Sequence, residues 1–207
     1  MMLNRLLLTA GSIFLMTSAV QAADPEDTLY MEISSGGRVV IELLPERAPG
    51  HVERIKKLAR AGFYDGLGFH RVIDGFMAQT GDPTGTGSGG SDEPDLKAEF
   101  SDHPYQRGTL GAARTSDPDS ANSQFFICFT DQGCSFLTGQ YTVFGQVTEG
   151  MEFVDKVARG EPPTKPDKIV KMVVAADADK AAPADNATPQ ASTAPATDAA
   201  ASKAPAR

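Results

Sequence analysis

Short apolar stretches, several of them β-branched, recur along the chain and predict β-strands. Residues 29–33 and 39–44 form two such stretches, and Gly36 and Gly37 lie between them, which is typical of a β-hairpin with a glycine-rich turn. Long segments rich in Gly, Asp, Ser and Pro separate the other predicted strands, which are residues 69–73, 109–113, 124–129, 141–147 and 168–174. The pattern therefore indicates a mainly β domain.

Two other segments carry the three- and four-residue apolar spacing of an amphipathic helix. The first begins near Pro49 and ends at Gly62. Its apolar side consists of Val52, Ile55, Leu58 and Ala59. The second spans residues 151–159. Many strands with two short helices far apart in the sequence predict an antiparallel barrel or sandwich whose open ends the helices cover.

The two ends of the chain differ in composition from the middle. Residues 1–22 combine a positive start, an apolar stretch and small residues at a cleavage position, which predicts a cleaved signal peptide, with an uncleaved anchor as the alternative. The apolar stretch is shorter than the roughly 20 residues that span a bilayer, so we expect no stable membrane insertion. Residues 177–207 are rich in Ala and Pro and contain nothing large to bury, which predicts a disordered tail. Residues 23–176 form the predicted domain.

Charge and motif content exclude several classes of function. Acidic residues outnumber basic ones, 27 to 19, and the formal net charge is −8, so we expect no nucleic-acid partner. The three histidines and two cysteines show no metal-ligand spacing. Neither a phosphate loop ending in Gly-Lys-Ser/Thr nor a serine-hydrolase motif is present. We therefore expect neither a metal nor a cofactor.

The two cysteines, Cys128 and Cys134, permit two interpretations. A disulfide is possible in an oxidising compartment. A cysteine in a strand is more often a small buried hydrophobic residue. The sequence therefore favours free thiols without excluding a disulfide.

One segment, residues 69–82, places an arginine where a strand should be apolar. Period-two alternation puts Arg71 on the same face as Phe69 and Ile73. One interpretation is an edge-strand arginine that reaches solvent or pairs with a carboxylate. The other is a hydrogen-bond donor directed into an apolar pocket. A second segment, residues 122–129, is apolar on both faces after Gln124, as in a buried strand.

Three motifs follow one another along the chain: Phe69-His70-Arg71 through Gly81-Asp82, then Asn122-Ser123-Gln124-Phe125-Phe126-Ile127, then Val143-Phe144-Gly145. Together they resemble the cyclophilin family of peptidyl-prolyl cis–trans isomerases. The resemblance extends from about residue 29 to residue 174. It implies a closed eight-stranded antiparallel barrel capped by two α-helices, and prolyl isomerase activity without a cofactor. The signal and the compact loops are similar to bacterial periplasmic members, so we expect a periplasmic protein, with secretion as the second choice.

The resemblance also implies roles for individual residues. Arg71 corresponds to the family's catalytic arginine. The implied substrate-binding residues are Phe76, Met77, Gln79, Ala113, Arg114, Gln124, Phe126, Phe136, Leu137 and Tyr141. Three of these depart from the family's pattern, since Arg114 replaces an Asn, Phe136 a Trp and Tyr141 a His.

The expected partners are proline-containing polypeptides. Because Phe136 lacks the indole N–H of the usual Trp, we expect weak cyclosporin binding. We also expect a monomer. Two other functions are considered: a peptide-binding chaperone module on the same barrel, with incidental isomerase activity, and a small-ligand barrel without a peptide role.

Overall fold

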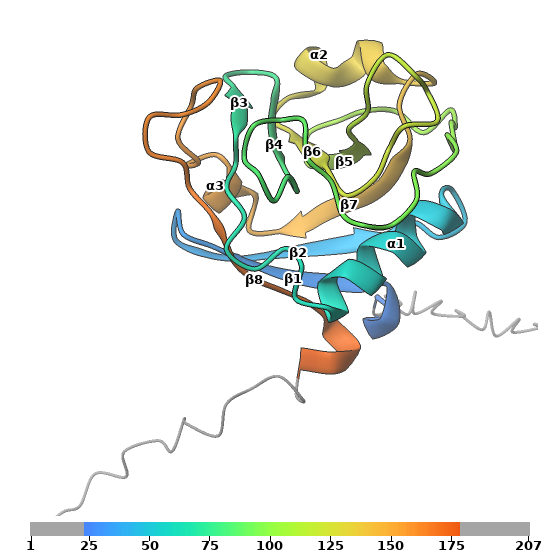
Figure 1. Ribbon diagram of the computed structural model, residues 1–207, viewed down its shortest axis with the longest axis horizontal. Helices are drawn as coiled ribbons and strands as arrows, with labels where there is room; N and C mark the ends of the chain where they lie inside the picture. The colour runs from blue at the N-terminus through green and yellow to red at the C-terminus, as the bar shows by residue number, and fades with distance from the viewer. Residues whose placement is uncertain (1–22, 179–207) are drawn as a thin grey trace, which may run out of the picture.

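The computed structural model describes residues 23–178, in which eight antiparallel strands form one curled sheet, a half-barrel (Figure 1). The order of strands across the sheet is β3-β4-β6-β5-β7-β2-β1-β8. The strands are β1 (Thr28–Ile33), β2 (Gly37–Leu43), β3 (Arg71–Ile73), β4 (Met77–Thr80), β5 (Thr109–Ala112), β6 (Phe125–Cys128), β7 (Val143–Glu149) and β8 (Ile169–Val174). The mainly β prediction is thus confirmed.

The first predicted hairpin is present, and its turn explains the glycines. β1 and β2 pair from Thr28↔Glu42 to Ile33↔Gly37. Gly36 has a φ of 130°, which L side chains rarely adopt. A side chain at Gly37 would collide with the ring of Phe153. Gly36 is therefore needed for its backbone conformation, and Gly37 for the space that it leaves to Phe153.

The prediction of a closed barrel is wrong, because the strand ladder stays open between β3 and β8. Only isolated bridges, Gly68↔Lys168 and Val72↔Gly160, cross this gap among the described residues. The chain on the β8 side of the gap contains Pro162, Pro163 and Pro166. Proline has no N–H to donate to a ladder, so this segment cannot form a continuous strand.

The helices differ in length from the prediction. α1 (Pro49–Arg60) confirms the first predicted helix and packs against β7 and β8. α3 (Met151–Val154) is a single turn, shorter than the predicted residues 151–159. It ends early because the amides of Lys156 and Val157 bond three residues back, as in a 3₁₀ turn. α2 (Asp131–Cys134), which the sequence analysis missed, lies at the top of Figure 1.

Two apolar clusters lie on opposite faces of the β3-β4-β6-β5 region. The larger cluster, the main core, fills the inside of the curled sheet and includes Phe69, Val72, Ala78, Leu110, Phe125 and Ile127. The smaller cluster, here the outer cluster, consists of Met77, Tyr105, Phe126, Cys128, Cys134, Leu137 and Val143. Phe69 is completely buried in the main core, so the prediction that it shares a face with Arg71 is wrong.

The boundaries of the described part bear on the predicted ends. Three short 3₁₀ helices complete the domain: η1 (Pro25–Asp27), η2 (Ser135–Leu137) and η3 (Ala175–Asp177). Asp177, the first residue of the predicted tail, accepts a 2.8 Å hydrogen bond from Arg60 Nε. The predicted signal, 1–22, and residues 179–207 of the predicted tail lie outside the described residues. Within residues 23–178, no helix has the length and apolar character needed to cross a membrane.

A carboxylate from a distant loop caps α1. Glu99 Oε1 accepts from the amide of Gly50 at 3.0 Å, and Glu99 Oε2 accepts from the amide of His51 at 3.1 Å. Oε2 also lies 2.7 Å from His51 Nδ1. Burial lowers the pKa of His51 despite this carboxylate. At neutral pH a neutral imidazole therefore donates its Nδ1 proton to Glu99.

The protein should lose stability as the pH falls below about 6.5. Burial lowers the pKa values of His51 and His70 below their ordinary value of 6.5. Below pH 6.5 the unfolded chain then binds more protons than the folded chain, so protonation favours unfolding. Urea unfolding at pH 7.5 and pH 5.5 measures the difference. In His51→Gln the loss between these two pH values should be smaller, and an equal loss would contradict this account.

Candidate functional site

A row of residues across four strands places Arg71 beside apolar groups. In the registers of the sheet, Arg71 lies opposite Gln79, Gln79 opposite Phe126, and Phe126 opposite Gly111. Residues opposite one another on antiparallel strands point to the same face. Arg71, Gln79 and Phe126 therefore share the outer face, above the outer cluster. The sequence placed Arg71 and Phe126 in separate motifs, and the sheet joins them.

A second row, two residues farther along each strand, extends this surface. Ile73 lies opposite Met77, and Met77 opposite Cys128. Met77 is 1% exposed and Phe126 is 5% exposed, whereas the side chain of Arg71 is 40% exposed. The cation thus lies at the edge of an apolar floor.

Tyr105 supports this floor, and the sequence analysis missed it. Its ring stacks on Phe126 with centroids 5.7 Å apart, and its hydroxyl donates to Thr142 O. Gly111 allows this stack, because a Cβ there would collide with Phe126 and with Tyr105 Oη. Tyr105 lies in a loop without periodicity, so no local pattern in the sequence indicated it.

Aromatic and aliphatic side chains form the walls around the floor. Phe76, in the turn between β3 and β4, has its ring 5.6 Å from that of Phe136 on η2. Leu137, also on η2, is 5% exposed and belongs to the outer cluster. Tyr141 meets Phe126 edge-to-face at 6.0 Å. The structure therefore brings together the predicted residues Phe76, Met77, Phe126, Phe136, Leu137 and Tyr141.

A polar groove of about 450 Å³ continues from this apolar surface. Four predicted residues line it: Gln79, Ala113, Arg114 and Gln124. Gln79 Nε2 donates to Gln124 Oε1 at 2.9 Å, and Gln124 Nε2 donates to the carbonyls of Gly87 and Gly89. The two glutamines therefore connect the sheet to the glycine-rich loop at the wall of the groove.

Asp82 holds that glycine-rich loop in place. Its carboxylate accepts from the amide and hydroxyl of Thr84, at 2.7 and 2.8 Å, and from the amide of Gly87. Burial alone would raise the pKa of Asp82, but the hydrogen bonds from Thr84 and the loop amides lower it to about 2. The carboxylate is therefore ionised throughout the neutral range, and the groove wall stays anchored.

Glu161, which the sequence analysis missed, holds the guanidinium of Arg71. Glu161 Oε2 lies 2.7 Å from Arg71 Nε. Residues 160 and 72 exchange backbone hydrogen bonds, which places Glu161 beside β3. Gln79 lies opposite Arg71 in the sheet, but its side chain bonds to Gln124. Within residues 23–178, Nη1 and Nη2 of Arg71 have no hydrogen-bond partner, so they remain available.

Arg114 departs from the family's pattern, and its side chain lies over Tyr141. The guanidinium carbon is 4.2 Å from the ring centroid, and Nη2 donates to Gln140 O. Arg114 thus covers one side of the Tyr141 ring. Two of the three departures, Arg114 and Tyr141, therefore form one contact at the rim of the site.

The described residues contain no metal-binding cluster. Among residues 23–178, no group of three or more His, Cys, Asp or Glu side chains is placed to hold a metal ion. The site residues offer hydrogen-bond donors at the edge of an apolar surface, beside a polar groove.

Comparison with known proteins matches this arrangement to one family. The family model "Cyclophilin type peptidyl-prolyl cis-trans isomerase/CLD" matches residues 28–174. A probable peptidyl-prolyl cis-trans isomerase of Brucella suis is 49% identical over 190 residues, covering 83% of this chain and 95% of the relative. Peptidyl-prolyl cis-trans isomerase B of Bacillus subtilis is 44% identical, covering 65% and 92%.

Solved structures show the same fold. A cyclophilin from Hirschia baltica superposes with a TM-score of 0.69 at 30% identity, covering 76% of this chain and 77% of that chain. A Cryptosporidium parvum cyclophilin-type isomerase, solved in the presence of the dipeptide Ala-Pro, gives a TM-score of 0.65 at 29% identity, covering 71% and 98%. The chain therefore belongs to the cyclophilin-type peptidyl-prolyl cis–trans isomerase family, and it is an enzyme of that type.

Proposed function

We propose that this enzyme accelerates rotation about X-Pro bonds in unfolded or newly exported polypeptides, with Arg71 stabilising the twisted amide. The observation that supports this role is the row of Arg71, Gln79 and Phe126 above the outer cluster. It places Nη1 and Nη2 of Arg71 at the edge of an apolar surface. The proline ring packs on Met77, Phe126 and Leu137. These three residues, together with Phe76 and Phe136, are called the proline slot.

The chemistry requires no bond to be made or broken. Rotation about an X-Pro bond breaks amide resonance, and the proline nitrogen regains a lone pair in the twisted state. A guanidinium N–H of Arg71 donates to this nitrogen, or to the neighbouring carbonyl oxygen. Glu161 keeps the guanidinium oriented through Nε and leaves Nη1 and Nη2 to the substrate.

The apolar floor strengthens this interaction. Phe126 and Met77 exclude water from the side of the slot where the proline ring lies, and a hydrogen bond to a charged donor gains strength in a locally low dielectric. The rate gain comes from binding the twisted state more tightly than either planar isomer. The polar groove beside Gln79 and Arg114 binds the peptide backbone preceding the proline.

A proline-limited refolding reaction tests this function against the chaperone alternative. Substoichiometric enzyme should accelerate the slow refolding phase of a protein whose refolding is limited by the trans-to-cis isomerisation of a proline. A chaperone module acts by occupying its client, so it would need about one molecule per client. A slow phase that changes only at stoichiometric enzyme would contradict the proposal.

We also propose that the protein acts in the periplasm after removal of residues 1–22. The composition of that segment supports export. N-terminal sequencing of protein recovered from the periplasmic fraction should give a sequence beginning near Ala23. Recovery of the protein with Met1 in the cytoplasmic fraction would contradict this proposal.

Cyclosporin should bind this enzyme weakly. Phe136 is 60% exposed and offers apolar area without an N–H donor. The lost hydrogen bond costs about 0.5–1.5 kcal/mol, and an acceptor left buried costs about 1–3 kcal/mol. Phe136→Trp should therefore lower the inhibition constant by about one to two orders of magnitude. Titration of isomerase activity in both forms measures this, and equal inhibition would show that the missing donor does not limit binding.

A further inference from the structure

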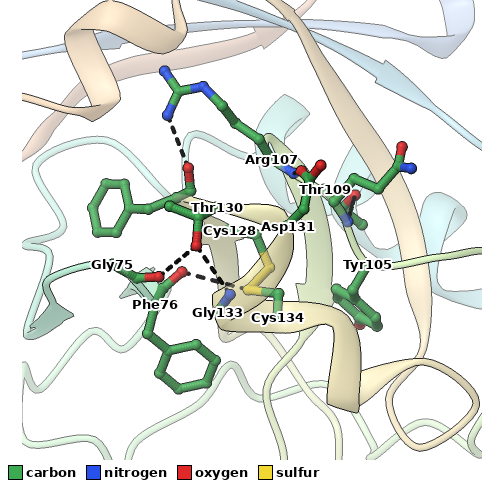
Figure 2. The surroundings of a disulfide bond; sticks show 12 residues. Gly75, Phe76, Tyr105, Arg107, Thr109, Cys128, Thr130, Asp131, Gly133 and Cys134 are labelled. Carbon is green, nitrogen blue, oxygen red and sulfur yellow. Dashed lines mark hydrogen bonds between the residues drawn. A yellow bond between two sulfur atoms is a disulfide. The ribbon is translucent and has the colours of Figure 1, made fainter.

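A disulfide lies within the outer cluster, directly beneath the proline slot. Cys128, at the end of β6, is bonded to Cys134, at the end of α2, with their Cα atoms 6.2 Å apart (Figure 2). Free thiols were the favoured interpretation of the sequence, and the structure corrects it. Both cysteines are fully buried, and the outer cluster also contains Met77, Phe126 and Leu137.

The disulfide joins a slot strand to the loop that carries two slot side chains. Cys128 lies on the same face of β6 as Phe126 and opposite Met77 in β4. Cys134 directly precedes η2, which carries Phe136 and Leu137. A covalent bond therefore connects the floor of the slot to its outer wall.

The same loop also contacts the turn that carries Phe76. Thr130 Oγ1 accepts from Gly133 N and donates to Gly75 O, as Figure 2 shows. The carbonyl of Phe76 accepts from Phe129 N at 2.8 Å. These contacts fix the start of the loop, whereas Cys134 fixes its end.

Phe136 depends on this attachment because it has little burial of its own. Its side chain is 60% exposed and meets Phe76 at 5.6 Å between ring centroids. An exposed ring gains little from packing, so the backbone of its loop determines where it lies. Leu137, the next residue of the loop, is buried in the outer cluster together with Cys134.

We propose that the Cys128–Cys134 disulfide is a positioning element of the proline slot, which holds Phe136 and Leu137 in the geometry that binds the proline ring. This inference rests on the proposed slot. The catalytic donor, Arg71, lies on β3 and is held by Glu161, so the disulfide does not position it.

Because the disulfide positions the slot and not the catalytic donor, its loss should change one kinetic constant and not the other. The slot contacts the proline ring in both planar isomers and in the twisted state. A well-ordered slot therefore strengthens the binding of all three states equally. Without the bond, the substrate must order the loop as it binds. KM should therefore rise about tenfold while kcat stays within about twofold.

The comparison uses one sequence in two redox forms. The full chain is unfolded in denaturant with dithiothreitol, whose dithiol gives two electrons and two protons to the disulfide and becomes a cyclic disulfide. The chain is then refolded in reductant, and a second sample is treated identically without it. KM and kcat for a proline tetrapeptide are measured by exchange NMR at 10 °C, where circular dichroism confirms that both forms are folded.

Cys128→Ala/Cys134→Ala is the matched control and the second test. Its KM should equal that of the reduced protein, and dithiothreitol should not alter it. If the reduced protein does not refold, this variant supplies the measurement without the bond. Equal KM values, within about twofold, in folded protein with and without the bond would overturn the proposal. A merely structural disulfide would lower the melting temperature and leave KM unchanged.

Two further variants separate this inference from the slot itself. In the oxidised protein, Phe136→Ala and Leu137→Ala should each raise KM. If neither does, the proposed slot is wrong, whatever the disulfide does. If both do while breaking the disulfide has no effect on KM, the slot stands and the positioning role of the disulfide is wrong.

Discussion

Arg71→Ala should lower kcat for a proline tetrapeptide about 10- to 150-fold, with the fold intact. A hydrogen bond to a charged group contributes about 1.5–3 kcal/mol, and each 1.36 kcal/mol corresponds to a factor of ten in rate. The side chain is 40% exposed, so its removal should cost little stability. A protease-coupled isomerisation assay measures the loss.

Two matched variants sharpen this result. Arg71→Lys should restore little activity, because an ammonium lacks the planar fork that lets Nε bond Glu161 while Nη1 and Nη2 face the substrate. Arg38→Ala removes another exposed, ion-paired arginine, far from the slot on the first hairpin, and should leave kcat unchanged. An Arg71→Ala enzyme with near-normal kcat would show that the donor is not needed.

Phe126→Ala should lower kcat/KM about 10- to 150-fold and also destabilise the protein. The loss of apolar contact with the proline ring corresponds to about 1.5–3 kcal/mol. Removing a buried Phe costs about 3–5 kcal/mol of the free energy of unfolding, and here it also leaves the Tyr105 ring without its partner. Assays at 10 °C and a thermal melt separate the two effects.

The neighbouring residue provides the control for stability. Phe125 points into the main core and meets Tyr64 and Phe144 edge-to-face. Phe125→Ala should cost about the same 3–5 kcal/mol but leave kcat/KM within about threefold while the protein is folded. If the two variants lose activity in parallel with stability, Phe126 has no special role in the slot.

Local patterns in the sequence predicted the elements whose periodicity is complete within one segment. The first hairpin and α1 satisfy their own turn and spacing rules, so they appear where expected. β4 was missed as a separate strand because Gly75, with a φ of 70°, reverses the chain within one continuous motif. The predicted second helix was longer than α3 because the apolar spacing continues to Val157, where the backbone already has 3₁₀ geometry.

The site residues came mainly from the family resemblance, and the sheet explains why they converge. Arg71, Gln79 and Phe126 are adjacent only because β3, β4 and β6 pair in one register. Glu161 and Tyr105 carry no motif of their own, and long-range pairing alone brings them to the site. The disulfide likewise depends on α2, which turns the chain so that Cys134 returns to Cys128.

Exchange NMR of a proline tetrapeptide with wild-type enzyme and with Arg71→Ala tests the central claim most directly, because it gives the dissociation constant and the on-enzyme isomerisation rate in the same sample. We expect Arg71→Ala to bind the peptide within about threefold of wild type while the on-enzyme rate falls at least about tenfold. A variant that loses affinity but isomerises its bound peptide at the wild-type rate would contradict it, since Arg71 would then bind the ground state and leave the twisted amide without a dedicated donor.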